Sequence, residues 1–165
     1  MGNEGAAEQT WATFQVVGKP IGEPRHRSFM RNGRMTAARN PMADPWKKAV
    51  RAAAIQARCK LFAGPVRVSL HFWVQRPKAH YVAGDRARPL KDSAPDWFTS
   101  KPDVDNMAKA VIDALGPWPK GAPPVAWKDD DIVVELHANK RYTPREAEPN
   151  PATGCDINIA EALSR

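Results

Sequence analysis

The chain has 165 residues, of which 42% are hydrophobic, including six Trp and five Phe; this length and composition predict one folded domain and exclude a disordered protein. It carries 25 Lys and Arg against 18 Asp and Glu, which gives a formal net charge of +7. No apolar run approaches the roughly 18 residues of a membrane-spanning helix, so we expect no membrane partner.

The first ten residues are polar and acidic and lack the apolar core of a secretion signal. We expect residues 1–10 to form a flexible leader to one domain over residues 11–165. Cys59 and Cys155 lie far apart and form no CxxC motif. Two incidental thiols are typical of a cytosolic chain, and we therefore expect a cytoplasmic protein.

The first half of the chain predicts a strand, a hairpin and a helix. Residues 11–17 are rich in aromatic and β-branched side chains and predict a strand, and a Pro- and Gly-broken loop follows. Asn32-Gly33 inside residues 29–36 favours a tight hairpin turn. Residues 45–60 carry an apolar stripe at helical spacing, with Pro45 in the first turn.

This first part of the chain also contains the whole basic excess. Residues 1–60 hold 11 Lys and Arg against four Asp and Glu, whereas residues 61–165 hold 14 of each. Such a segment is typical of a polyanion-binding protein, and a solubilising surface is the alternative. Because the guanidinium fork suits phosphate oxygens, the candidate phosphate contacts are four arginines of the loop and hairpin: Arg25, Arg27, Arg31 and Arg34.

The second half predicts further strands around one helix. Apolar and polar residues alternate over 66–75, which predicts a strand with one buried face. Residues 77–100 show no sustained period and predict a long functional or mobile loop. A helix is expected over 104–115, stopped by Gly116-Pro117. Residues 132–139 alternate and predict another strand with one buried face.

Ile157 and Ile159 suggest a short last strand. The element order is then close to βαβαββ with an extra hairpin. This order predicts an α/β fold, in which a small mixed β-sheet is packed with two main helices in a single domain.

The helix over 104–115 starts with an unusual run of charged residues. Pro102 disfavours helix at Lys101, so Asp103 or Asp105 is placed as the N-cap. Asp105, Lys109 and Asp113 are spaced i, i+4, i+8 along one face. A capped helix with a ladder of surface ion pairs explains these residues by themselves, at a few tenths of a kcal/mol per pair.

A second acidic run, Asp129-Asp130-Asp131, precedes the strand over 132–139. Adjacent like charges are costly without a counter-charge, although a solvated turn is the alternative. We expect this run to meet the helix start and, with Asp103 and Asp105, to hold a hard cation such as Mg²⁺. Such a cation generates hydroxide and stabilises charge on a phosphodiester, and Lys109 is placed to contact the phosphate or orient the water.

The motif Lys-Pro-Asp-Val-Asp-Asn-Met-Ala-Lys-Ala-Val-Ile-Asp-Ala-Leu, from Lys101 to Leu115, resembles the signature of the RusA family of Holliday junction resolvases. The downstream Trp-Lys-Asp-Asp-Asp-Ile-Val-Val, from Trp127 to Val134, is similar to the family's Asp-Asp before a Val-rich strand. The resemblance is close over residues 101–141 and looser before them. It implies a homodimeric α/β endonuclease that nicks branched DNA with Mg²⁺, for which Mn²⁺ substitutes.

Carried over onto this chain, the resemblance implies Asp103, Asp105 and Asp130 as metal-binding carboxylates and Lys109 as the catalytic lysine. Aligning Trp127 with the aromatic residue that precedes the family's Asp-Asp pair selects Asp130 as the metal ligand. Shifting this alignment by one residue would assign that role to a neighbouring Asp. The alternates are Asp129, Asp131 and Asp113, and Asp113 is also expected to be a structural ion-pair partner of Lys109. Lys101 joins the four arginines as a candidate DNA contact.

Trp97 and Phe98 precede the acidic motif, and we expect them to anchor the long loop, with stacking on DNA as the alternative. The leading hypothesis is a metal-dependent endonuclease that resolves four-way junctions in DNA recombination and repair. One alternative is a broader branched-DNA or flap nuclease of phage type. The other is a non-catalytic protein that binds junctions.

Overall fold

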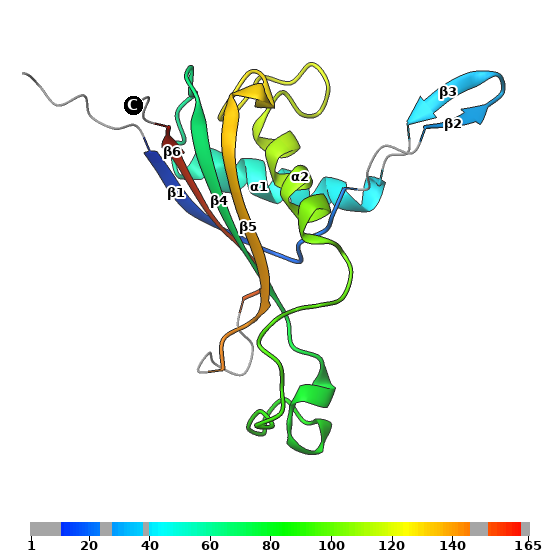
Figure 1. Ribbon diagram of the computed structural model, residues 1–165, viewed down its shortest axis with the longest axis vertical. Coiled ribbons are helices and arrows are strands. Elements are labelled where there is room, and N and C mark those ends of the chain that lie inside the picture. Colours follow the sequence, from blue (N-terminus) through cyan, green and yellow to red (C-terminus); the bar gives the residue numbers. More distant parts are fainter. Residues whose placement is uncertain (1–10, 24–27, 38–39, 146–151, 163–165) are drawn as a thin grey trace, which may run out of the picture.

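The computed structural model describes residues 11–23, 28–37, 40–145 and 152–162. The expected leader, Arg25 and Arg27 lie outside these residues. Four strands form one sheet in the order β1 (Trp11–Val17), β6 (Gly154–Glu161), β4 (Val66–Val74) and β5 (Val133–Tyr142) (Figure 1). β6 runs antiparallel to both β1 and β4, whereas β4 and β5 are parallel. The predicted mixed sheet is confirmed.

Two helices, α1 (Asp44–Gln56) and α2 (Val104–Leu115), cover one face of this sheet. Their apolar stripes meet the inward faces of β1, β4 and β6 in one core, which includes Trp46, Met107 and Phe72. The bounds of α2 are those predicted. The helix predicted over 45–60 ends at Gln56, because Ala57 caps it and Arg58 takes a positive φ of 55°. The fold class is therefore confirmed.

The expectation that strand 132–139 buries one face is correct only at its ends: Ile132 and Ala138 pack against the core, whereas the two apolar residues between them on that face do not. Ile132 lies in a short 3₁₀ turn (Asp130–Ile132), and β5 starts one residue later. Val134 and Leu136 are 56% and 48% exposed. β5 is the edge strand of the sheet, and alternation of residue types does not reveal how far other elements cover the face of an edge strand.

A hairpin of β2 (Ser28–Arg31) and β3 (Arg34–Ala37) projects away from the sheet (Figure 1). Asn32 and Gly33 take the positive φ angles of the predicted turn, at 51° and 74°. Arg34 is exposed, and Arg31 pairs with it across the hairpin backbone. At the base of the hairpin, Asn40 donates a hydrogen bond to the Gly22 carbonyl at 3.2 Å.

The long segment 77–100 contains no long helix or strand, and hydrogen bonds near its two ends hold it in place. It contains two 3₁₀ turns (Lys78–His80 and Val82–Gly84) and lies beyond one end of the sheet (Figure 1). The buried guanidinium of Arg76 donates to Thr143 O, Pro95 O and the Asp96 carboxylate. Hydrogen bonding and charge from Arg76 and Arg145 lower the pKa of Asp96. Charged anchors therefore hold this segment on the sheet.

Gly154 at the start of β6 lies against the backbone of β1, so we expect a side chain at this position to be strongly destabilising. A Cβ at this position would lie 1.9 Å from Val16 O, so backbone would have to move. We expect Gly154→Ala to lower the free energy of unfolding by about 3 kcal/mol, measured by urea denaturation. Gly64→Ala is the control, because a Cβ there meets nothing within 4 Å. Equal midpoints for the two variants would contradict this prediction.

Candidate active site

The start of α2 presents the first two predicted carboxylates to solvent. Asp103 is the N-cap residue in an extended conformation, and its side chain makes no capping hydrogen bond. Its carbonyl accepts from Met107 N at 3.1 Å and so opens the helix. Asp105 lies in the first turn, and both carboxylates are exposed. The alternative explanation, in which the Asp103 side chain serves only to cap the helix, is therefore not supported by the structure.

Lys140 on β5 fixes the segment that leads into this helix. Its ammonium donates to Ser100 O at 2.6 Å and to Pro102 O at 2.7 Å, and it lies 5.0 Å from the centre of the Phe98 ring. These bonds tie the backbone immediately before Asp103 to the edge strand. A strand side chain therefore sets the position of the helix N-terminus.

The base of the hairpin packs against the same helix start. Glu23 N donates to Asn106 O at 2.9 Å, and Gly22 is so close that an added Cβ would lie 3.0 Å from Asn106 Cβ. A cleft of about 570 Å³ opens here, lined by Gly22, Asn40, Lys101, Pro102, Asp103 and Asn106. Residues on either side of the basic hairpin in the chain thus line one cleft with the first carboxylate.

Lys109 lies at the middle of α2 and is held by Asp113. Its ammonium is 2.7 Å and 3.0 Å from the two Asp113 carboxylate oxygens. The ammonium of Lys47 on α1 also reaches Asp113, at 3.5 Å, and pairs with Glu23 at 2.8 Å; Lys47 and Glu23 are both buried. This network joins α1, α2 and the hairpin base, and it confirms the expected ion pair between Asp113 and Lys109.

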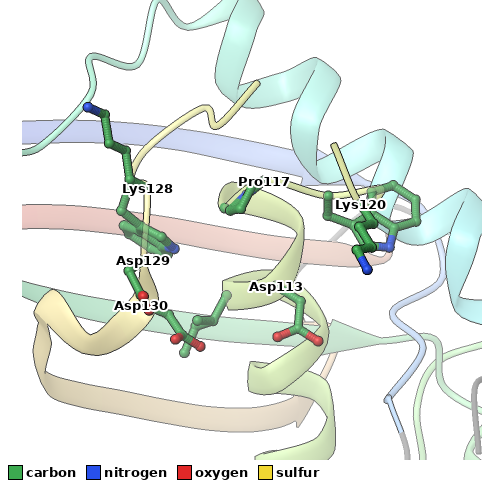
Figure 2. A pocket seen from close by; sticks show the side chains of 10 residues that line it. Asp113, Pro117, Lys120, Lys128, Asp129 and Asp130 are labelled. Carbon is green, nitrogen blue, oxygen red and sulfur yellow. The ribbon is translucent and has the colours of Figure 1, made fainter. Parts of the chain in front are cut away.

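The second acidic run lies near the other end of α2. Asp129 accepts from Asp131 N at 3.4 Å, and all three carboxylates are exposed. Asp129 and Asp130 line a pocket of about 410 Å³ together with Ile112 and Asp113 of α2. Figure 2 shows Asp113 on the helix, across this pocket from the segment that carries the other two acids.

The carboxylates at the two ends of α2 do not converge in one chain. Asp103 to Ile112 spans about 13 Å along the helix axis, at about 1.5 Å per residue. In the sheet register, Val133 next to the acidic turn is opposite Val66, whereas Lys140 next to Pro102 is opposite Phe72. Across the described residues, no three Asp, Glu, His or Cys side chains form a group that could hold a metal ion.

The expectation that the acidic run meets the helix start is thus corrected. The physical reason is the crossover from β4 through α2 to the parallel strand β5, which makes α2 run opposite to both strands. The start of α2 therefore lies at one end of the strands and the start of β5 lies at the other. The carboxylates suit Mg²⁺ chemically, but one chain does not assemble them around a metal.

Two lysines that hold the elements of the candidate site in place were missed from the sequence. Lys140 was not among the predicted site residues. Its position after Val134, Leu136 and Ala138 on the same strand face could have indicated an anchoring role. Lys47 carries no such signal, because a Lys next to Trp46 on an amphipathic helix is normally a surface residue. Its burial depends on Glu23 and Asp113, which approach only in the folded chain.

A comparison with protein families matches residues 18–148 to the endodeoxyribonuclease RusA family. The chain belongs to the RusA family. The matched residues contain the helix α2, its two acidic ends and Lys140. The chain is also 33% identical over 134 residues to YqaN, an uncharacterized protein of Bacillus subtilis (strain 168), with 79% of this chain and 87% of that protein covered. Within the described residues, no helix is long and apolar enough to cross a membrane.

Proposed function

We propose that this RusA-family protein is a metal-dependent endodeoxyribonuclease that cuts four-way DNA junctions during recombination and repair. The observation that carries this proposal is the exposed, uncapped carboxylate of Asp103 in a cleft shared with Lys101 and the base of a hairpin that bears Arg31 and Arg34. A carboxylate near the base of a basic hairpin is suited to metal-assisted phosphodiester cleavage, because the hairpin can bind the DNA backbone while the carboxylate binds the metal. Family membership supports the same activity.

Mg²⁺, replaceable by Mn²⁺, is the proposed cofactor, and it would supply an activated water and stabilise charge on the scissile phosphate. Asp103, Asp105 and Asp130 are the proposed ligands, and Lys109, one turn after Asp105 on α2, is the proposed catalytic lysine. Because one chain keeps Asp130 away from the other two, we assign the complete site to a homodimer. Each site then takes Asp103 and Asp105 from one protomer and Asp130 from the other.

A two-fold axis perpendicular to α2 near its middle satisfies this requirement. Such an axis makes the two α2 helices antiparallel, so the start of one helix lies beside the end of its partner. The exposed Val134 and Leu136 of the edge strand β5 offer apolar area for such an interface. Two sites related by this axis match the two strands that must be cut to resolve a junction.

The test is a nicking assay on an end-labelled synthetic four-way junction. We expect paired nicks with Mg²⁺ or Mn²⁺ and none with EDTA, because carboxylates alone do not activate water near neutral pH. A matched linear duplex is the control substrate. Faster cutting of flaps and forks than of junctions would favour the broader branched-DNA nuclease. Tight, salt-sensitive binding without any cutting would leave only a junction-binding protein.

A further inference from the structure

A second pocket adjoins the Asp103 cleft and contains none of the proposed metal ligands. It has a volume of about 400 Å³ and shares Lys101 and Pro102 with that cleft. Its remaining lining comes from the segment after β1, the end of β4, the segment before α2 and the residue before β6: Lys19, Pro20, Val74, Gln75, Phe98 and Thr153.

Both walls of this pocket are held by hydrogen bonds. On one side, Gly18 N donates to Thr153 O at 2.9 Å, and the Thr153 hydroxyl donates to Gly18 O at 3.1 Å. On the other side, Lys140 holds the carbonyls of Ser100 and Pro102. The pocket is therefore formed before any ligand arrives, as is usual for small-ligand sites.

The lining combines flat apolar surface with positive charge. Phe98 is half-buried, and its ring meets Tyr142 edge-on with centroids 5.3 Å apart. Lys19 and Lys101 are exposed, and neither pairs with a carboxylate in the part of the chain that the structure describes. An apolar pocket with unpaired cations at its rim suits a planar ring that is joined to anionic groups.

We propose that this pocket binds one unstacked nucleobase of the branched DNA, while Lys19 and Lys101 contact the phosphates that flank it. The inference rests on the proposed nuclease function, because the adjoining Asp103 cleft would hold the scissile strand. A base inside a duplex exposes only its edge, so its ring enters a pocket only after unstacking. The branch point of a junction supplies such bases at the lowest cost. The pocket would thus select branched over linear DNA.

The test measures binding without cleavage, using Asp105→Asn protein and a fluorescent four-way junction in an anisotropy titration. Single nucleotides near the branch point are replaced in turn by abasic sites, which remove the base and keep the phosphates. We expect one position at which the abasic site weakens binding about tenfold, the size of one base–aromatic contact. With Phe98→Leu added, the same abasic site should change binding by at most about twofold, because the contact is already absent.

Phe98→Tyr keeps the ring and should restore sensitivity to the abasic site, which separates stacking from a general packing role. Lys19→Gln should weaken binding to every junction and lower the salt slope by about one, whereas the exposed Lys60→Gln should not. The proposal is overturned if no abasic site weakens binding, or if the abasic site weakens binding equally in the Phe98→Leu variant. Nicking by the unmodified protein tests the proposed function separately, so either idea can fail alone.

Discussion

Asp105→Asn lowers the rate of junction nicking by at least about 10³-fold and leaves the protein folded; this is the largest single-residue effect that we expect. Asn has nearly the shape of Asp but no negative charge, and hard cations require charged oxygen ligands. Asp105 is exposed in the first turn of α2, so the core should not respond to its replacement. The measurement is single-turnover nicking with Mg²⁺, together with a thermal melt.

Asp92→Asn is the matched control, because Asp92 is also exposed but lies in the 77–100 segment. It should nick at the rate of the unmodified protein. If Asp105→Asn nicked equally fast, Asp105 would not be a metal ligand and the proposed site would be wrong. If both variants lost activity, the effect would reflect surface charge near the DNA instead of a metal site.

Mixing two inactive variants should restore activity if the site is shared between protomers. In a heterodimer of Asp105→Asn and Asp130→Asn protomers, one shared site would contain both substitutions and the other would contain neither. We therefore expect about half of the unmodified activity from this heterodimer, since one of two independent sites survives. If instead each chain held its own complete set of ligands, both sites would be damaged and no activity would return.

The heterodimer is obtained by co-expressing the two chains with different affinity tags and purifying over both. A heterodimer of Asp103→Asn and Asp105→Asn is the control, because both residues lie at the same end of α2 and each shared site would lose one ligand. It should stay inactive. Mn²⁺ titration by calorimetry gives a readout independent of cutting: about one site per rescued dimer and none per control dimer. A chain that is monomeric at assay concentrations would contradict the shared site.

The base of the hairpin packs against the start of the acidic helix α2. Gly22 and Glu23 contact Asn106, one residue after Asp105, and the buried pair of Glu23 and Lys47 continues to Asp113. A buried ion pair is costly to break by removing one partner. Gly22 and Glu23, which precede the hairpin in the chain, are therefore fixed to α2 by buried contacts.

Much of the fold follows from local patterns along the chain. The bounds of α2 were predicted because Pro102, the acidic first turn and Gly116-Pro117 mark both ends of a strongly periodic apolar stripe. The Asn32-Gly33 turn was predicted because few other residues tolerate two successive positive φ angles. The exposure of Val134 and Leu136 was not predicted, because the position of a strand in the sheet depends on partners distant in the sequence.

By itself, the sequence determined the candidate groups of this protein: its proposed oxygen ligands, its basic hairpin and its family motif are all local features of residue type and spacing. The tertiary structure alone decided how those groups are placed. A parallel β4–α2–β5 crossover sends the start of α2 and the start of β5 to opposite ends of the sheet, so Asp103 and Asp130 are separated. The same folding buries Lys47 and brings Lys140 to Pro102, contacts between residues that no local pattern connects.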